Sequence, residues 1–400
     1  MVRIRVALFL SVFVLPIIVL GDELPLPETE LKALKFEARG EYRKSYEAYL
    51  SATKDAIKCG IEKEKSGDKN AAKAFWASAE VYLHRTVSLF SQMANPDYNE
   101  LASALGEIDS EANNAVFSGY VKYYLSQALL RCGRAESARQ IADSAGFVRH
   151  WFIVGPFDNE QGTGFETAYP PEEKVNFKEV YKGKRRAVKW REIPVDAPLP
   201  IIDMNAMMRP NDQVLAYAAS YVFSPVAQDV AIRIGSDEGF KLFVNGREVA
   251  SDNVKRRFEF DQNVVAAHLS EGWNLIMLKV AELKDEWKFC VRLTAPDGSP
   301  LKGLRFAKTM EEASSIEVAN YVEAKAIVER GARDYYEMVL EKESAEDPVA
   351  LFHLAYLHTV YHWMDETVRK NREYLEKLLS KYKESAILWF FAAQSYIEEV

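Results

Sequence analysis

The chain has 400 residues, of which 48% are hydrophobic and 28% charged, and its formal net charge is −8. This composition is typical of a folded protein and excludes a largely disordered chain. The length exceeds one ordinary hydrophobic core, so we expect two or three domains. The acidic balance disfavours a general nucleic-acid partner and predicts no more than good solubility.

A basic and then apolar segment opens the chain. Arg3 and Arg5 precede an almost unbroken apolar run from Val6 to Leu20. The run of about 15 residues is shorter than the roughly 20 that a membrane-spanning helix needs. We therefore predict a signal peptide over residues 1–21 and export to the periplasm or outside the cell, with an uncleaved N-terminal anchor as the alternative. No second run of spanning length follows, so we expect no membrane span in the mature chain.

Export permits disulfides, but the chain has only three cysteines, Cys59, Cys132 and Cys290. Cys59 and Cys132 lie in the same helical segment and could pair. We favour three buried free thiols, because the number is odd and Cys290 lies in a strand alternation. No cysteine or histidine spacing typical of a metal site accompanies them.

Residues 27–146 have helical hydrophobic periodicity. Glycine permits a turn between antiparallel helices, and a small residue lets the two backbones approach. A glycine with a small residue five positions later occurs three times, as Gly40 and Ser45, Gly67 and Ala72, and Gly133 and Ala138. The pattern predicts helix hairpins, with Tyr49 and Trp76 filling grooves nine positions after the first two glycines.

The stretch Tyr124-Leu-Ser-Gln-Ala-Leu-Leu-Arg-Cys-Gly-Arg-Ala-Glu-Ser-Ala138 resembles the tetratricopeptide repeat family. The glycines Gly40 and Gly67 are 27 positions apart, which departs from the family period of about 34 residues. The resemblance implies stacked hairpins whose concave faces bind a protein partner. An irregular helical bundle is the alternative.

Residues 150–305 have strand periodicity interrupted by tight turns. Asn245-Gly246 between two apolar runs favours a type I′ hairpin. We predict strands over residues 215–223, 230–234, 240–244, 247–249, 264–269, 275–280 and 287–293. At least six short strands of this kind indicate an antiparallel β-sandwich.

Two stretches of this segment, Gly235 to Val249 and Leu269 to Val280, resemble the galactose-binding-like or PA14-like jelly-roll families. Together with Trp151 to Glu172 and the helical segments, they are similar to large exported bacterial tetratricopeptide proteins, some of which carry a transglutaminase-like domain further downstream. The resemblance implies sugar or calcium binding. A transglutaminase core needs a Cys nucleophile with His and Asp partners, and none of the three cysteines stands in such a setting.

The ligand-binding candidates follow from that resemblance. Asp237, Glu238 and Asp252 carry oxygen ligands suited to Ca²⁺, although Ser-Asp-Glu-Gly is also an ordinary turn sequence. Trp190 and Trp273 are candidates to stack on a sugar ring as exposed aromatics. We favour Trp273 as a core residue, because it begins an apolar strand.

Two clusters of basic residues suggest binding to an anionic partner. If the fold brings them together, they form a cationic face for an anionic polysaccharide; otherwise they are solvated loops. The first cluster comprises Lys182, Lys184, Arg185, Arg186, Lys189 and Arg191, and the second Lys255, Arg256 and Arg257.

Helical periodicity returns over residues 312–400. Asp347-Pro348 opens a helix, and a related apolar pattern recurs 37 positions after Leu351, at Leu388. His358 and His362 are four residues apart, with His353 nearby. Thr359 stands where the zinc-protease motif requires Glu, so we expect packing histidines rather than a metal site.

We therefore predict a multidomain α + β protein, with tetratricopeptide-like helical repeats flanking an antiparallel jelly-roll sandwich. No nucleophile, base and orienting group stand at a recognisable spacing, so we expect a non-enzymatic exported scaffold without a cofactor. Its helices would contact a protein partner, and its sandwich would bind a glycan or act as a spacer. The alternatives are the non-catalytic N-terminal portion of a transglutaminase-like envelope enzyme and a carbohydrate-binding module.

Overall fold

The computed structural model describes residues 24–194, 197, 199–284, 286–342, 346–361 and 365–397. The chain divides into two compact units, one made of the residues up to Phe117 and from Gly331 onward, the other of Ser118–Arg330. We call them the helical unit and the β unit. The predicted signal peptide, residues 1–21, lies outside the described residues.

This division differs from the boundaries expected from the sequence. The two segments predicted as separate helical blocks, 27–146 and 312–400, contribute most of their residues to one unit. Residues 118–146 and 312–330 belong instead with the predicted sandwich segment. The mixed α and β content itself is confirmed.

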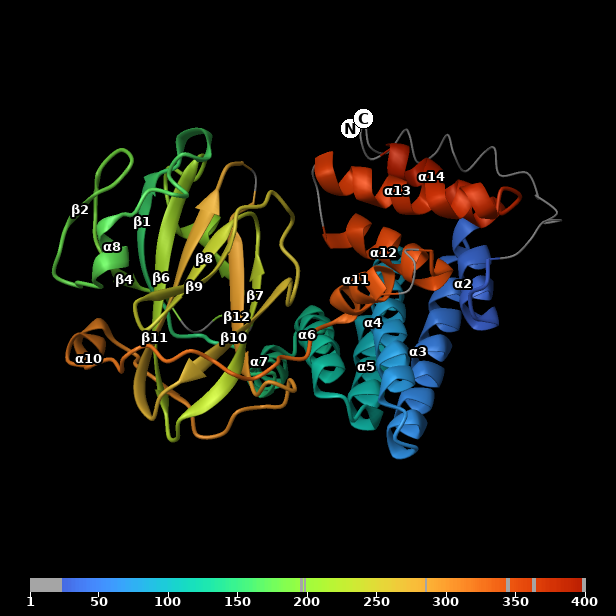
Figure 1. The fold of residues 1–400 in the computed structure, drawn as a ribbon, viewed down its shortest axis with the longest axis horizontal. Helices are drawn as coiled ribbons and strands as arrows, with labels where there is room; N and C mark the ends of the chain where they lie inside the picture. The colour runs from blue at the N-terminus through green and yellow to red at the C-terminus, as the bar shows by residue number, and fades with distance from the viewer. Residues whose placement is uncertain are drawn as a thin grey trace. The chain divides into compact units, whose positions relative to one another are not determined.

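The helical unit is built from hairpins of long helices. Figure 1 shows α3 and α4 as an antiparallel pair at one end of this unit. Gly40 and Gly67 take positive φ angles of 71° and 81° at the turns before α3 and α4, a region that favours glycine. The helices are α2 (Glu28–Ala38), α3 (Tyr42–Lys65), α4 (Lys69–Gln92), α5 (Tyr98–Glu111), α11 (Ala332–Lys342), α12 (Pro348–Tyr361), α13 (Asp365–Lys381) and α14 (Ala386–Ile397).

Small residues allow these helices to approach closely, as the glycine pattern predicts. The hydroxyl of Ser45 is buried and donates to the carbonyl of Ala33 on the neighbouring helix at 2.8 Å. The indole of Trp76 lies against Gly60, where an added Cβ would be 3.0 Å from the ring. A larger side chain at either position would push the hairpins apart.

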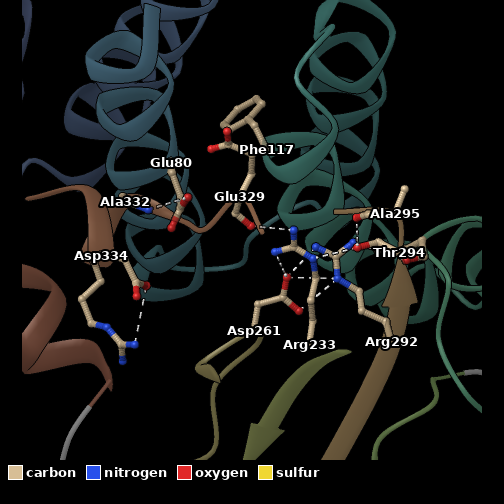
Figure 2. A network of polar contacts seen from close by, with 12 residues as sticks. Glu80, Phe117, Arg233, Asp261, Arg292, Thr294, Ala295, Glu329, Ala332 and Asp334 are labelled. Carbon is tan, nitrogen blue, oxygen red and sulfur yellow. Dashed lines mark hydrogen bonds and ion pairs between the residues drawn. The ribbon is translucent and has the colours of Figure 1, made fainter. Parts of the chain in front are cut away.

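Helices from the N-terminal part of the chain pack against helices from its C-terminal part in this unit. Helix α11 packs against α4, and α14 packs against α2. At the start of α11, the backbone N–H of Ala332 donates to the buried carboxylate of Glu80 at 3.0 Å (Figure 2). Segments more than 250 positions apart in the sequence thus share one core.

The β unit contains two larger antiparallel sheets. One has the strand order β4-β1-β6-β11-β8-β9, with β13 added to β6, and the other has the order β10-β7-β12-β5. The strands are β1 (Phe152–Asp158), β2 (Tyr181–Lys182), β3 (Ala187–Val188), β4 (Arg191–Glu192), β5 (Ile202–Asp203), β6 (Val214–Ser224), β7 (Gln228–Ser236), β8 (Phe240–Val244), β9 (Arg247–Asp252), β10 (Asn263–Leu269), β11 (Gly272–Glu282), β12 (Lys288–Thr294) and β13 (Arg305–Phe306).

The larger sheet is buried on both faces. Residues of β6 alternate between two hydrophobic clusters: Ala216 and Ala218 face a core shared with the smaller sheet, whereas Leu215 and Tyr217 face a second cluster with Trp190. The second cluster also includes Tyr181 and Val188 of the small β2–β3 sheet. Burial on both faces explains why the central strands are almost continuously apolar.

The outer face of the smaller sheet is covered by helices α6 (Ala115–Arg131) and α7 (Ala135–Ser144). Tyr123 of α6 stacks on Phe260 with ring centroids 4.6 Å apart. The backbone after α7 joins β12, because Leu293 N–H donates to Gly146 O at 2.8 Å. These contacts place residues 118–146 in the β unit, where the sequence predicts part of a helical domain.

A segment with almost no regular structure joins the sheets to α11. After the short helix α10 (Met310–Ser314), residues 316–331 contain no helix or strand. The backbone N–H groups of Lys325 and Ala326 both donate to one oxygen of Asp229, at 2.9 and 2.8 Å. Glu329 N–H donates to Pro296 O at 2.8 Å. The segment is therefore fixed to the β unit along its length. Across the described residues, no helix is both long and apolar enough to span a membrane.

Candidate functional site

Four of the predicted ligand-binding residues meet where the loops after β7 and β9 come together. Glu238 N–H donates to Arg256 O at 3.3 Å, which joins the loop carrying Asp237 and Glu238 to the loop carrying Arg256. The guanidinium of Arg256 lies 3.4 Å from Asp252. We call Asp237, Glu238, Asp252 and Arg256 the loop cluster.

Arg256 organises this cluster from a buried position. Its Nε donates to the carbonyl of Ser236 at 3.1 Å, and its Nη2 donates to Asn263 Oδ1 at 2.6 Å. Asn263 in turn donates to the same Asp252 oxygen that pairs with Arg256, at 3.0 Å. The carboxylate of Asp252 is therefore held by a cation and an amide, which compete with any metal ion for its oxygens.

The Glu238 side chain binds a backbone N–H group of a neighbouring loop. It adopts a positive φ of 62°, and its Oε2 accepts from Leu283 N–H at 2.6 Å. The described residues contain no group of three or more His, Cys, Asp or Glu side chains arranged to hold a metal ion. In this structure the Glu238 carboxylate accepts from a backbone N–H, and the Asp252 carboxylate is ion-paired with Arg256.

Asp237 is the unusual carboxyl of the cluster. It is only 5% exposed, and burial together with Glu238 raises its pKa to about 8. A carboxyl that is protonated at neutral pH offers both a donor and an acceptor. Burial also raises the pKa of Glu259, on the same loop as Arg256, to about 7.

The basic residues lie around separate loops. Lys255 and Arg257 flank Arg256 and are exposed, and Arg185 and Arg186 are exposed beside the β2–β3 turn. Lys184 is paired with Asp158 and Glu160 at 3.2 and 2.9 Å. The described contacts do not join the two basic clusters into one face.

The aromatic candidates are not exposed stacking platforms. The expectation that Trp190 is exposed is wrong: it is 1% exposed, and its indole N–H donates to the Tyr181 hydroxyl at 3.3 Å. It packs in the second cluster of the larger sheet because the segment 152–192 folds back over that face. Trp273 is half-buried and meets Phe223 edge-on, with ring centroids 5.5 Å apart.

Sequence reasoning missed two buried lysines on the larger sheet. Lys241 and Lys279 are direct cross-strand partners on β8 and β11. Lys279 Nζ lies 2.9 Å from Glu172, and Lys241 Nζ lies 2.7 Å from Glu166. Burial lowers the pKa of Lys279, whereas Glu172 raises it. The sequence feature that could have identified them is a single lysine inside each of two otherwise apolar strands, β8 and β11.

A buried ion triad lies on the outer face of the smaller sheet, as Figure 2 shows. Asp261 accepts from Arg292 Nε at 3.0 Å, and Arg233 Nη1 lies 3.5 Å from the same carboxylate. Arg233 also donates to Thr294 Oγ1 at 3.1 Å and to Glu329 O at 2.8 Å. We call Arg233, Asp261 and Arg292 the arginine triad. It connects three strand or loop segments to the segment after α10.

A second buried polar network lies in the helical unit. Glu30 and His353 are both fully buried, with His353 Nε2 2.9 Å from the Glu30 carboxylate. His353 Nδ1 contacts the Tyr336 hydroxyl at 2.7 Å, and Tyr82 donates to Glu30 at 2.9 Å. We call these four residues the histidine network. His353 thus has packing and hydrogen-bonding partners, whereas His362 lies outside the described residues.

The three cysteines are free thiols in the structure. Cys290 is buried as expected, whereas Cys59 and Cys132 are only partly buried, which differs from the expectation of three buried thiols. Burial raises the pKa of the Cys290 thiol, which keeps it in the unreactive protonated form.

The polar groups of both units are thus arranged for ion pairing and hydrogen bonding. A scan against protein-family models, a search of curated proteins and a search of solved structures each found no match to this chain.

Proposed function

We propose that this protein is a non-enzymatic exported binding protein with two contact modules. The helical unit, with tetratricopeptide-like hairpins, would recruit a protein partner. The β unit, a jelly-roll of the galactose-binding-like kind, would hold a glycan. The basic and apolar start of the sequence supports export.

The loop cluster is the observation that carries the glycan proposal. Arg256 and Asn263 fix the Asp252 carboxylate, and Asp237 lies beside them with a protonated carboxyl at neutral pH. Exposed Lys255 and Arg257 flank the cluster. Fixed donors and acceptors next to cationic side chains suit a ligand rich in hydroxyl and carboxylate groups.

A glycan array followed by calorimetric titration of the full mature chain tests this proposal. We expect binding of an acidic oligosaccharide that weakens at least tenfold in the double variant Lys255→Ala, Arg257→Ala. Lys302→Ala removes an exposed cation elsewhere in the β unit and is the matched control. Well-folded protein without any array signal, or equal weakening in the control, contradicts the glycan role.

The helical role is tested by capture of partners from an envelope fraction. Figure 1 shows α3 and α4 side by side in this unit, as a helix hairpin of the kind that repeat proteins stack into a broad contact surface. We expect the full chain to retain a partner that residues 118–330 alone do not retain. Capture of every partner by residues 118–330 would assign recruitment to the β unit.

A further inference from the structure

A strongly basic segment, residues 174–191, forms and surrounds the small β2–β3 sheet. It contains eight Lys or Arg residues and one acidic residue, Glu179, which gives a formal charge of +7 in a chain whose formal net charge is −8. Figure 1 shows the part around β2 as a loop beside β1 and β4 in the β unit. The positive charge is therefore a property of one local surface and not of the whole protein.

Inward-facing residues anchor this segment to the larger sheet. Tyr181 and Val188 are opposite each other in the β2–β3 pairing, and both lie with Trp190 in the second cluster. At the turn between the two strands, the backbone N–H of Lys184 donates to the carbonyl of Pro156 on β1 at 2.9 Å. The β2–β3 sheet is therefore a fixed support for the side chains on its other face.

The outer face of this small sheet carries cations without counter-ions. Because side chains alternate along a strand, Lys182 and Ala187 point away from the second cluster. The turn between the strands exposes Arg185 and Arg186. Six exposed cations of the segment have no ion-pair partner among the described residues: Lys174, Lys178, Lys182, Arg185, Arg186 and Lys189.

Three acidic side chains within or next to the segment are engaged by other groups. Glu172 lies 2.9 Å from Lys279, and Glu192 accepts from the backbone N–H of Met310 at 2.7 Å. Glu179 accepts from an asparagine amide of its own turn at 3.2 Å. The exposed cations are therefore free to attract anions from outside the chain.

Val180 adds an apolar side chain to the same face. It is 64% exposed and lies two residues before Lys182, so the alternation of side chains puts both on the outer side. Tyr181 pairs with Val188, and continuing that register by one residue puts Val180 opposite Lys189. The valine is therefore flanked by a cation along its own strand and by another across the sheet.

We propose that this outer face docks on an anionic phospholipid bilayer. We call Val180, Lys182, Arg185, Arg186 and Lys189 the basic platform. Each Lys or Arg held close to an anionic membrane surface strengthens binding by about fivefold, and a small apolar group can enter the layer just below the headgroups. The proposal concerns a surface separate from the loop cluster, and it does not depend on glycan binding there.

A bilayer fits the basic platform better than a sugar polymer does. Sugar sites combine an exposed ring for stacking with polar groups at fixed positions. Trp190 and Tyr181, two rings of this small sheet, are only 1% and 4% exposed, so they offer no stacking surface. Phospholipid headgroups diffuse within the membrane and gather around cations at any spacing, and the layer beneath them is apolar, which suits Val180.

Sedimentation of the full mature chain with vesicles tests the proposal. We expect binding to vesicles of equal parts phosphatidylglycerol and phosphatidylcholine, no binding to pure phosphatidylcholine vesicles, and weaker binding as salt is raised. Replacing four platform cations should lower the affinity for the anionic vesicles at least tenfold. The substitutions of this platform variant are Lys182→Gln, Arg185→Gln, Arg186→Gln and Lys189→Gln.

The matched control changes the net charge by the same amount at exposed lysines elsewhere in the β unit. It should bind the anionic vesicles like the wild type. Its substitutions are Lys284→Gln, Lys302→Gln, Lys308→Gln and Lys325→Gln. A wild type that does not bind anionic vesicles, or an equal loss of affinity in the platform variant and the control, would overturn the proposal.

A gain of binding provides a second test that does not depend on the folding of the platform variant. Tryptophan favours the membrane interface, so Val180→Trp should bind the anionic vesicles more tightly than the wild type. Val226→Trp replaces a valine that is 54% exposed outside the platform and should leave binding unchanged. No gain for Val180→Trp, or an equal gain for Val226→Trp, would refute the docking of this face.

Two further arms separate the bilayer from other partners. Soluble dextran sulfate at the same concentration of anionic groups should bind more weakly than the vesicles, and equal binding would assign the platform to a soluble polyanion instead. Lys255→Ala, Arg257→Ala, which tests the glycan role of the loop cluster, should bind the vesicles like the wild type. Loss of vesicle binding in that double variant would place the membrane contact at the loop cluster and contradict the platform.

Discussion

The two units join distant segments of the chain with different buried chemistry. In the histidine network, the Glu30 carboxylate contacts His353 and Tyr82, an imidazole and a phenol, neither of which carries a permanent charge. In the arginine triad, one carboxylate, Asp261, lies between two guanidinium groups that do not lose their protons. Other guanidinium N–H groups donate to the backbone carbonyls of Ala145 and Glu329 and to the Thr294 hydroxyl.

This difference sets how each unit responds to the loss of a partner. A buried neutral hydrogen-bonding group left unsatisfied costs about 1–3 kcal/mol. An uncompensated buried charge costs about 3–5 kcal/mol. The β unit should therefore be the more sensitive of the two to removal of its central carboxylate.

The strongest test removes the segments that complete the arginine triad. A fragment of residues 118–330 contains α7, most of α6 and the segment after α10, whereas residues 150–305 lack the carbonyls of Ala145 and Glu329. We expect the longer fragment to unfold cooperatively in urea. We expect the shorter one to aggregate or to show no cooperative transition. Equal stability of the two fragments would show that the helices are dispensable for the β unit.

Among single substitutions, Asp261→Ala should have the largest effect. It leaves Arg233 and Arg292 buried without their common counter-ion, so the free energy of unfolding should fall by about 3–5 kcal/mol. Chemical denaturation of the full chain measures the change. Asp212→Asn, at an exposed position of the same unit, is the control and should change stability by less than about 0.5 kcal/mol.

Glu30→Ala tests the corresponding centre of the helical unit. The substitution removes an acceptor from His353 and from Tyr82, and we expect a loss of about 2–3 kcal/mol in unfolding free energy. Glu28→Ala, on the exposed side of the same helix, should cost no more than about 1 kcal/mol. A larger loss for Glu30→Ala than for Asp261→Ala would reverse the comparison between the units.

Gly119→Ala tests whether α6 packs tightly against the smaller sheet of the β unit. A Cβ at Gly119 would clash with Arg292 Nη2, so the helix or the guanidinium must move. We expect a loss of about 1–3 kcal/mol, measured by thermal or urea unfolding. Gly106→Ala on α5 meets no atom within 4 Å and should stabilise the chain by up to about 1 kcal/mol.

The smallest expected effect is a change in the pH dependence of stability, caused by Asp237 of the loop cluster. The pKa of Asp237 is raised from its ordinary value of 3.8 to about 8, so its ionisation opposes folding. The wild type should therefore lose stability as pH rises from about 4 to about 8, and Asp237→Asn should remove part of this loss. Loop movement can relieve the ionised carboxyl, which keeps the effect modest. The free energies of unfolding measured at pH 5 and pH 9 should differ less for Asp237→Asn than for the wild type. The same difference in both proteins would contradict the raised pKa of Asp237.

Local patterns identify the regular elements well. Asn245-Gly246 predicts the β8–β9 hairpin, and both residues take positive φ angles, 49° and 80°. Gly40 and Gly67 predict turns between helices, and Asp347-Pro348 predicts the start of α12. These predictions succeed because turns and caps depend on the φ and ψ preferences of a few adjacent residues.

Site predictions are less complete, for a physical reason that individual residues illustrate. Asp237, Glu238, Asp252 and Arg256 do meet, because the loops after β7 and β9 cross at that point. Trp190 is buried rather than exposed, since nothing in its sequence neighbours shows that residues 152–192 fold over the sheet.

The sequence by itself determined the helical and strand content, the turn positions and the mixed α + β class. Only the tertiary structure decided that the first and last helical segments form one unit and that α6 and α7 cover a sheet. Periodicity records which face of an element is apolar but not which distant element covers it. The partners of Glu30, Asp261 and Lys279 lie between 28 and 323 positions away in the chain, a separation at which no local pattern carries information.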